Sequence, residues 1–234
     1  MDSKTISPRR KFIGNLAAGA AALGMLSIPE SIKAAPSLLE DPGSDADKWF
    51  DQLKMKKHKI MFDVTTPHKN PEEMMPFAWP RVFLLTNGMT GTPAKDCGVV
   101  MILRHSGIPY AFNDSMWAKY NFGEMFGTTD PFTGKPATKN DFAKPAQGAF
   151  KVPGFGAVPI GINELQADGV MIGVCNAAMT VFSAMVGEKM NVDGKTILAE
   201  WKANLLPGIQ VLPSGVWAVG RAQEHGCGYC FAGA

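Results

Sequence analysis

Short apolar runs that alternate with helical patterns are the feature that most constrains the fold of this chain. The clearest run, GVVMILR at residues 98–104, is almost continuously apolar, which is typical of a strand buried on both faces of a parallel sheet. Parallel strands need long crossover connections, and segments with helical periodicity supply them here. The sequence therefore predicts one three-layer α/β/α domain with a mainly parallel sheet. The predicted strands cover 58–64, 98–104, 169–174 and 209–212, and the predicted helices cover 80–87, 115–126, 176–190, 194–205 and 214–225.

Two segments fall outside this alternation. Residues 127–161 contain five prolines and six glycines with little periodicity, which indicates a long surface insertion. Such an insertion either covers a site, or is passive or faces another copy in an oligomer, and both interpretations stay open. Residues 36–56 are expected to form a linker followed by a short amphipathic segment, so the α/β domain is expected to span 57–234.

Residues 1–35 resemble a twin-arginine export signal. Arg9 and Arg10 precede an apolar stretch at 16–28, and the small residues Ala34 and Ala35 follow it. The stretch is shorter than the ~20 residues that a spanning helix needs, so no stable membrane anchor is expected. The resemblance implies export by the twin-arginine machinery, cleavage close to Ala35, and a periplasmic or otherwise exported mature protein.

The charge of the chain depends on this signal. The full chain carries a net charge of +2, and residues 1–35 hold five basic and two acidic residues, so their removal leaves −1. This balance does not indicate nucleic-acid binding. The remaining 199 residues are enough for one well-buried core. An exported protein meets oxidising conditions, so its four cysteines become candidates for disulfides.

Cys175 stands where the apolar run at 169–174 ends and the predicted helix at 176–190 begins. In parallel α/β sheets, ligands bind at the carboxyl ends of the strands. A thiol at a helix N-terminus also meets the positive end of the helix dipole, which favours the nucleophilic thiolate. Cys175 is therefore the candidate catalytic residue, and a buried cysteine that acts as a small apolar residue is the alternative.

Two stretches carry a family resemblance. The run GVMIGVCNAAM at 169–179 and the segment PSGVWAVGRA at 213–222 resemble the two signature regions of the DsrE-like family of sulfur-relay proteins. The resemblance implies a flavodoxin-like three-layer fold and a homo-oligomer. It also implies that Cys175 carries sulfur as a persulfide. Its partners would be a small sulfur species or a sulfur-carrier protein.

Further candidates follow the other predicted strands. His105 ends the run at 98–104 and is expected at the same edge as Cys175. There it either assists a thiolate or binds an anion, or it is a hydrogen-bonded structural histidine. His68 follows the first strand and is a weaker candidate at that edge. Cys97 precedes a buried strand and is expected in the core.

Cys227 and Cys230 have the spacing of a thiol–disulfide pair, CGYC. Because they follow a predicted helix end, where the dipole does not activate a thiol, a structural disulfide between them is expected. A zinc site that adds His225 lacks a clear fourth ligand, so no metal is predicted. The sequence holds no nucleotide-binding or hydrolase motif, and no cofactor is predicted.

These features lead to one principal hypothesis and one alternative. The principal hypothesis is an exported DsrE-like protein that binds or relays a small sulfur species through Cys175. The alternative is a non-catalytic binding or assembly module whose cysteines are structural. The reactivity of the Cys175 thiol distinguishes the two.

Overall fold

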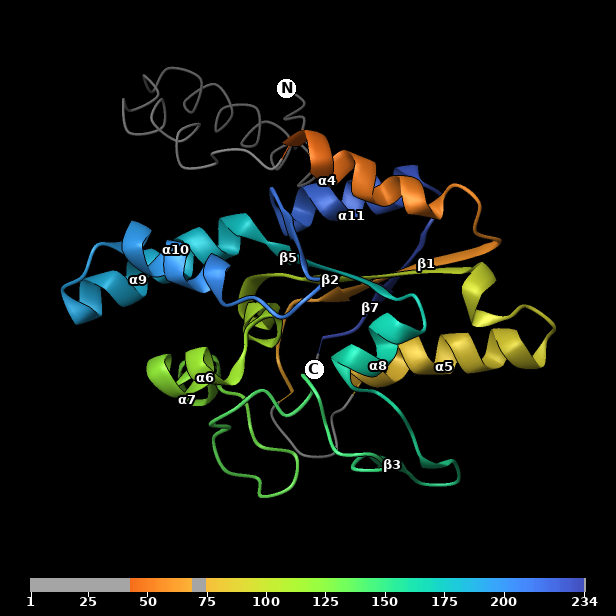
Figure 1. The fold of residues 1–234 in the computed structure, drawn as a ribbon, viewed down its shortest axis with the longest axis horizontal. Helices are drawn as coiled ribbons and strands as arrows, with labels where there is room; N and C mark the ends of the chain where they lie inside the picture. The colour runs from red at the N-terminus through yellow and green to blue at the C-terminus, as the bar shows by residue number, and fades with distance from the viewer. Residues whose placement is uncertain (1–42, 69–74, 234) are drawn as a thin grey trace, which may run out of the picture. The chain divides into compact units, whose positions relative to one another are not determined.

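The computed structural model of the protein describes residues 43–68 and 75–233. The predicted export signal, with Arg9 and Arg10, and the start of the predicted linker lie outside the described residues. The described part contains a five-stranded sheet in the order β6-β5-β2-β1-β7, and every neighbouring pair in it is parallel. Helices cover both faces of this sheet (Figure 1), which confirms the three-layer α/β/α, flavodoxin-like fold.

The elements have the following bounds. The strands of the sheet are β1 (His58–Val64), β2 (Cys97–Leu103), β5 (Met171–Cys175), β6 (Gln210–Leu212) and β7 (Gly228–Phe231). The helices are α4 (Gly43–Trp49), α5 (Met75–Met89), α6 (Asp114–Tyr120), α7 (Phe122–Phe126), α8 (Ile162–Ala167), α9 (Asn176–Met190), α10 (Gly194–Ala203) and α11 (Gly215–Glu224). The 3-10 segments are η1 (Phe50–Leu53), η2 (Ala94–Asp96) and η3 (His105–Ala111), and a small hairpin is formed by β3 (Lys151–Val152) and β4 (Gly156–Ala157).

Two hydrophobic cores lie on opposite faces of the sheet. α4 and α11 cover one face, and α5 and α8 cover the other (Figure 1). In β2, Val100 and Ile102 join the core beneath α4 and α11, whereas Val99 and Met101 join the core on the α5 side. This two-residue period places apolar side chains on both faces, which is why the run GVVMILR is apolar up to Arg104.

The elements with the strongest patterns lie where the sequence predicts them. β1 covers the predicted 58–64, and β2, β5 and β6 begin and end within two residues of their predicted bounds. α9 covers 176–190 as predicted. The Ser214 side chain accepts a hydrogen bond from the Trp217 backbone N–H, so it caps α11, as its position before a helical pattern suggests.

Segments with weaker sequence patterns differ more from their predicted structure. α5 begins at Met75 and contains Pro80, whereas the helix predicted from the sequence begins only at residue 80. Phe77, fully buried, anchors the first turn of α5 by packing. The single helix predicted at 115–126 is divided into α6 and α7, because Asn121 adopts a left-handed φ of 50°. β7 was not predicted, since four residues that include exposed Tyr229 give no clear apolar pattern.

The segments outside the predicted alternation also contribute to the cores. The short amphipathic segment expected before residue 57 forms α4 and η1, whose Phe50 and Leu53 are fully buried beneath α11. Within the insertion at 127–161, Phe142 stacks on Phe150 with ring centroids 4.8 Å apart and on Phe77 of α5 at 4.3 Å. The insertion therefore packs against the α5 side of the domain. Within residues 43–68 and 75–233, no helix has the length and apolar character needed to cross a membrane.

Candidate functional site

The carboxyl ends of β5 and β6 lie at a topological switch point. After β5 the chain enters α9, whose Met179 joins the core shared with α5, whereas after β6 it enters α11, whose Ala218 joins the opposite core. Adjacent parallel strands whose following helices go to opposite faces mark the place where open α/β sheets bind ligands. A backbone hydrogen bond from Ala177 N to the Pro213 carbonyl oxygen, at 3.2 Å, joins the two loops.

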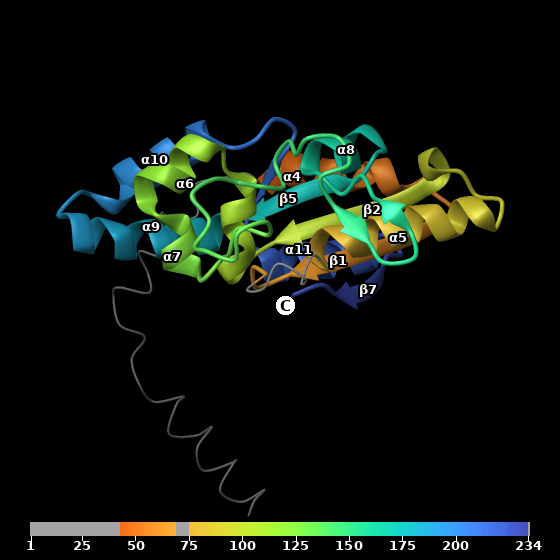
Figure 2. The ribbon, with the colours of Figure 1, turned by 90° about the horizontal axis from the view of Figure 1, so that it is seen from below.

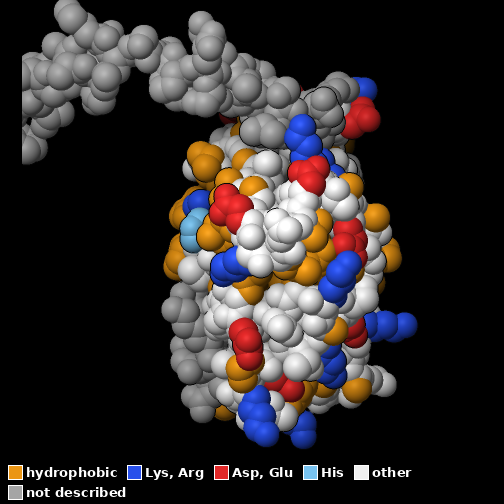
Figure 3. Space-filling model, turned by 90° about the vertical axis from the view of Figure 1, so that its left-hand side faces the viewer, with side chains coloured by type: hydrophobic (Ala, Val, Ile, Leu, Met, Phe, Trp, Pro, Cys, Tyr) orange, Lys and Arg blue, Asp and Glu red, His pale blue; other side chains and the backbone are white. Residues whose placement is uncertain are grey.

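This edge of the sheet faces one end of the described part. The arrowheads of β1 and β2 point toward the side where α6, α7 and α9 lie (Figure 2). Seen from that side, acidic and basic side chains are scattered among hydrophobic ones (Figure 3). α9 exposes Val181 and Met185 to 58% and 47%. No single sign of charge dominates the face in this view.

Cys175 is both the last residue of β5 and the N-cap of α9. Its backbone is extended, with φ −72° and ψ 109°, and its Sγ accepts a hydrogen bond from the Ala178 backbone N–H at 3.2 Å. The residue is 6% exposed. A thiolate at this position receives a backbone donor and the positive end of the dipole of a 15-residue helix, both of which stabilise negative charge. The structure therefore places Cys175 where the sequence predicts it.

Arg104 follows β2 at the same edge and binds a buried carboxylate. Its Nε donates to Asp63 Oδ1 at 2.6 Å and its Nη2 donates to Asp63 Oδ2 at 2.7 Å. Asp63, in β1, is 1% exposed and also accepts a hydrogen bond from the Tyr229 hydroxyl of β7 at 2.9 Å. The bond with Asp63 is the main cause that raises the pKa of Arg104, and the charge of a Cys175 thiolate acts in the same direction.

The first residue of α11 packs directly on the Arg104 side chain. A Cβ added to Gly215 would lie 2.4 Å from Arg104 Cβ and 2.5 Å from its Cδ, so only glycine fits there without a shift. Arg104 Nη1 has no hydrogen-bond partner among the described residues. The guanidinium is thus oriented by Asp63, and the two N–H groups of Nη1 stay available to an anion at this edge.

Asp63, Arg104 and Tyr229 are site residues that were not predicted from the sequence. A signal was present for two of them, because a charged side chain at the carboxyl end of each of two apolar runs is expected at the same sheet edge. Tyr229 had no such signal, since β7 itself was not predicted. The pairing of these residues depends on strand order, which places β1 between β2 and β7.

His105 lies at this edge as predicted, but no hydrogen bond joins it to Cys175 in the described part of the chain. It is exposed and its φ is +49°, a left-handed value that residues other than glycine seldom adopt. Its Nδ1 lies 2.9 Å from the Ser106 hydroxyl, and its ring meets Phe182 of α9 edge-on at 6.0 Å. His105 therefore lies near the site but makes no hydrogen bond to the Cys175 thiol.

Cys97 and His68, two other residues considered from the sequence, are both buried. Cys97 is 2% exposed in the core and begins β2, at the amino end of the strand, so the prediction of a core cysteine is confirmed. His68 is also buried, and its Nδ1 lies 2.5 Å from the Tyr110 hydroxyl while its ring packs edge-on against Phe142. His68 therefore packs between η3 and the insertion.

The expected disulfide between Cys227 and Cys230 is not formed in the structure, where all four cysteines, each in the described part, are free. The physical reason is the period of an extended chain, in which residues three apart point to opposite faces. Cys227 joins the core beneath α11, whereas Cys230 packs against the core on the α5 side. Burial raises the pKa of Cys227 to about 11, and it also raises the pKa of Cys230 and of Cys97.

The described residues offer no obvious metal centre. In the ranges 43–68 and 75–233, no group of three or more His, Cys, Asp or Glu side chains is arranged to hold a metal ion. His225 instead has its Nδ1 2.9 Å from the Arg221 carbonyl oxygen, and its Nε2 lies 3.8 Å from Asp51.

The edge therefore combines a nucleophile with groups that stabilise negative charge. Cys175 supplies the sulfur, the N-terminus of α9 supplies a backbone donor, and Arg104 supplies an oriented positive charge. This arrangement suits the reversible attachment of a small anionic group to a thiol. Comparisons with protein-family models, with curated proteins and with solved structures found no match to this chain.

Proposed function

We propose that this protein is an exported carrier that binds or relays a small sulfur species as a persulfide on Cys175. The observation that carries the proposal is the Cys175 Sγ at the N-terminus of α9, hydrogen-bonded to the Ala178 N–H at the switch point of the sheet. The resemblance of residues 169–179 and 213–222 to the DsrE-like sulfur-relay family supports the same chemistry.

The proposed transfer needs no cofactor and no oxidant. The Cys175 thiolate attacks the terminal sulfur of a persulfide donor, a new S–S bond forms on Cys175, the S–S bond of the donor breaks, and the donor leaves as a thiolate. The transferred sulfur keeps its proton or loses it to water. Attack by an acceptor thiolate on that outer sulfur reverses the step and regenerates Cys175. The donor and acceptor are small sulfur species or a sulfur-carrier protein.

Arg104 supports this chemistry as a positioning residue. Asp63 accepts hydrogen bonds from two of the guanidinium nitrogens. The guanidinium therefore keeps one orientation when a ligand binds. Its remaining Nη1 suits a persulfide anion, which keeps negative charge on its outer sulfur. In this proposal Asp63 acts on the thiol only through Arg104.

The order in which the thiols react tests the proposal. If exposure alone decides, the partly exposed Cys230 reacts before the three buried cysteines. If the helix dipole and the backbone donor decide, Cys175 reacts first near neutral pH, on the order of tenfold faster than Cys230. Raised pKa values keep Cys97, Cys227 and Cys230 as thiols at that pH. Time-resolved alkylation of the native protein, followed by peptide mass spectrometry, measures the order.

The same measurement includes its own control. After denaturation without reductant all four cysteines should be alkylated, because the structure joins none of them. Labelling of Cys230 first, with Cys175 left unmodified, would favour structural cysteines and the alternative function.

The alternative, a non-catalytic assembly module, is favoured by one observation on α5. Trp79, Val82, Leu85 and Met89 are exposed at helical spacing on its outer side. The single charged residue of that helix, Arg81, is 6% exposed and pairs with Asp168. An outer helix face without charge suits association with another copy of the chain. This association is compatible with a reactive Cys175, because α5 does not contribute to the carboxyl edge site.

The exported location in this proposal rests on Arg9 and Arg10. Changing both arginines to lysine keeps the charge and should block export, because the resemblance is to a signal recognised by its arginine pair. Cell fractionation should then show uncleaved precursor in the cytoplasm, whereas Lys11→Arg should be exported normally. N-terminal sequencing of the wild-type mature protein should begin close to Pro36. An uncleaved wild-type protein in the cytoplasm would contradict the export prediction.

A further inference from the structure

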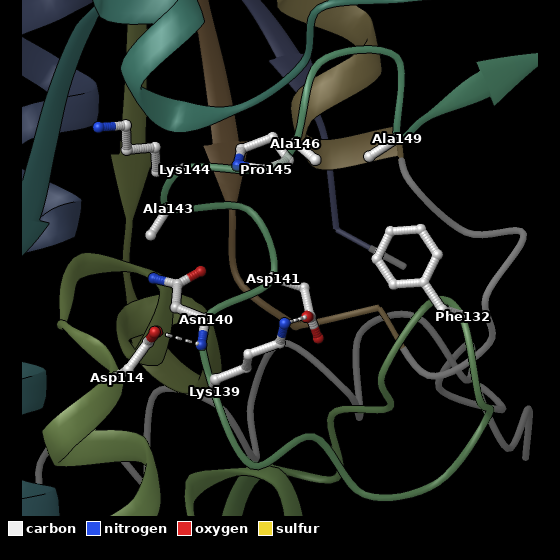
Figure 4. A pocket seen from close by; sticks show the side chains of 10 residues that line it. All are labelled: Asp114, Phe132, Lys139, Asn140, Asp141, Ala143, Lys144, Pro145, Ala146 and Ala149. Carbon is white, nitrogen blue, oxygen red and sulfur yellow. Dashed lines mark hydrogen bonds and ion pairs between the residues drawn. The ribbon is translucent and has the colours of Figure 1, made fainter.

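A cavity lies within the insertion, away from the edge that holds Cys175. It has a volume of about 240 Å³ and is lined by residues of the insertion and by Asp114 of α6 (Figure 4). None of its lining residues belongs to the group formed by Asp63, Arg104 and Cys175. Phe132 and several small apolar side chains form part of its wall, namely Ala143, Pro145, Ala146 and Ala149.

Asp141 is a buried carboxylate that no hydrogen bond satisfies among the described residues. Its side chain is 3% exposed, and neither oxygen accepts a hydrogen bond. Its ion-pair partner is Lys139, whose Nζ lies 3.4 Å from Oδ1, longer than the ~2.8 Å of a charge-assisted hydrogen bond. Burial raises the pKa of Asp141, Asp130 adds to the rise, and Lys139 opposes it. The Lys139 side chain is 58% exposed, so it is free to move from this position.

Asn140 adds a second unsatisfied acceptor. Its Nδ2 donates to the carbonyl oxygens of Tyr110 and Phe112, both at 2.9 Å, which determines how the amide is oriented. Its backbone N–H donates to Asp114 Oδ1 at 3.0 Å. The Asn140 Oδ1 is buried and has no partner among the described residues. A buried acceptor without a donor is costly, and native proteins retain few of them.

We propose that this cavity binds a small zwitterion that carries one ammonium group and one carboxylate group. The ammonium group takes the place of the Lys139 amine beside the Asp141 carboxylate, while Asn140 Oδ1 is, among the described residues, a second unpaired acceptor in the lining of the cavity. The displaced Lys139 then pairs with the carboxylate of the ligand. Figure 4 shows Lys139 and Asp141 joined by their ion pair, with Phe132 across from them and the Lys144 amine directed away.

Charge balance favours a zwitterion over a simple cation or anion. Inserting a neutral zwitterion into the Lys139–Asp141 pair leaves every charge with a partner, whereas a plain amine leaves Lys139 without one and a plain carboxylate leaves Asp141 unchanged. The volume is below the ~300 Å³ lower limit of drug-sized sites, so the ligand is compact. The apolar wall suits a short apolar side chain, as in a small α-amino acid.

Nuclear magnetic resonance titration of the full chain tests the proposal with three probes, L-alanine, n-propylamine and propionate. The backbone amides of Asn140 and Asp141 and the Asn140 side-chain amide are the reporters. L-alanine should shift these signals in a saturable way, with affinity about tenfold or more above either probe that carries one charge. Equal affinity for n-propylamine, or no saturable shift with L-alanine, would overturn the proposal.

Three variants separate the cavity from general charge effects. Asp141→Asn keeps the shape of the side chain and should lose L-alanine binding. Lys139→Ala should weaken it about tenfold while leaving the fold intact, because that side chain is mostly exposed. Asp96→Asn is the matched control, since Asp96 pairs with Lys57 at 3.2 Å outside the cavity and its loss should not affect binding. Wild-type affinity in both Asp141→Asn and Lys139→Ala would also contradict the assignment.

Discussion

Replacing Cys175 with serine is expected to abolish sulfur loading of the protein by polysulfide or by a persulfide donor. A hydroxyl at this position is not a nucleophile toward sulfane sulfur near neutral pH, because unlike a thiol it does not ionise there. The fold should remain, since serine is nearly the same size and its oxygen can accept the Ala178 N–H that Cys175 Sγ now accepts. Intact-protein mass spectrometry after incubation with the donor measures the added sulfur.

The other cysteines provide matched controls for this experiment. Cys97→Ser and Cys230→Ser should both load sulfur as the wild type does. Cys97 lies at the amino end of β2, and Cys230 lies in β7, which β2 and β1 separate from β5. Thermal unfolding of Cys175→Ser close to that of the wild type would show that lost loading is not lost folding. Equal loading in the wild type and in Cys175→Ser would refute the assignment of Cys175. Loading in neither protein would favour the assembly-module alternative.

Replacing Arg104 with methionine is expected to have the largest effect on stability of any change at the site. The change keeps the apolar stem that packs on Gly215 but leaves Asp63, 1% exposed, without its bidentate partner. Breaking a buried ion pair costs about 3–5 kcal/mol, and the lower value applies here because the Arg104 side chain is 29% exposed, so water reaches the vacated place. For a domain of this size, about 3 kcal/mol lowers the melting temperature by roughly 6–12 °C, which calorimetry measures.

Two comparisons make this prediction specific. Lys119→Met removes one partner of the more exposed Lys119–Glu200 pair, so it should lower the melting temperature much less than Arg104→Met does. Adding Asp63→Asn to Arg104→Met removes the stranded charge and should restore part of the lost stability. A melting temperature of Arg104→Met no lower than that of Lys119→Met would show that the buried pair does not stabilise the fold.

The predictions for Cys175→Ser and for Arg104→Met concern the same site at the carboxyl edge of the sheet. Asp63 orients Arg104, and the Arg104 guanidinium lies within electrostatic reach of Cys175. Arg104→Met should therefore slow sulfur loading as well as destabilise the fold, whereas Cys175→Ser should affect loading alone. A structural role for Arg104 by itself would leave the loading rate of the folded variant unchanged.

Strong periodic patterns were enough to predict most of the sheet and the helices after it. β2 and β5 are apolar throughout because they are buried on both faces, and β1 is buried and mainly apolar in its second half, residues 61–64. A pattern with that cause can be read in the residues themselves. The same reasoning located Cys175, since an apolar run followed at once by a helical pattern defines a strand end and a helix start. Both features depend on residues that are neighbours in the chain, so they can be predicted from the sequence alone.

Features that depend on neighbours in space could not be predicted in this way. Cys227 and Cys230 looked like a disulfide pair by spacing, but β7 places them on opposite faces of the sheet. The residues around these two cysteines show no strand pattern that would predict β7. As an edge strand beside β1, β7 allows exposed side chains such as Tyr229. The strand was therefore decided by pairing with β1 and not by its own pattern.

The sequence by itself determined the class of the fold, the position of the candidate nucleophile and the place of the insertion. Burial on two faces and helical periodicity both produce local patterns of apolar residues, and these patterns are visible in the sequence. Only the tertiary structure decided the order of the strands, and with it the contact of Asp63 with Arg104 and Tyr229 across three strands. It also decided that the insertion encloses Asp141 in a cavity. Such contacts join residues far apart in the chain, and their energies depend on burial and on a partner that no local pattern specifies.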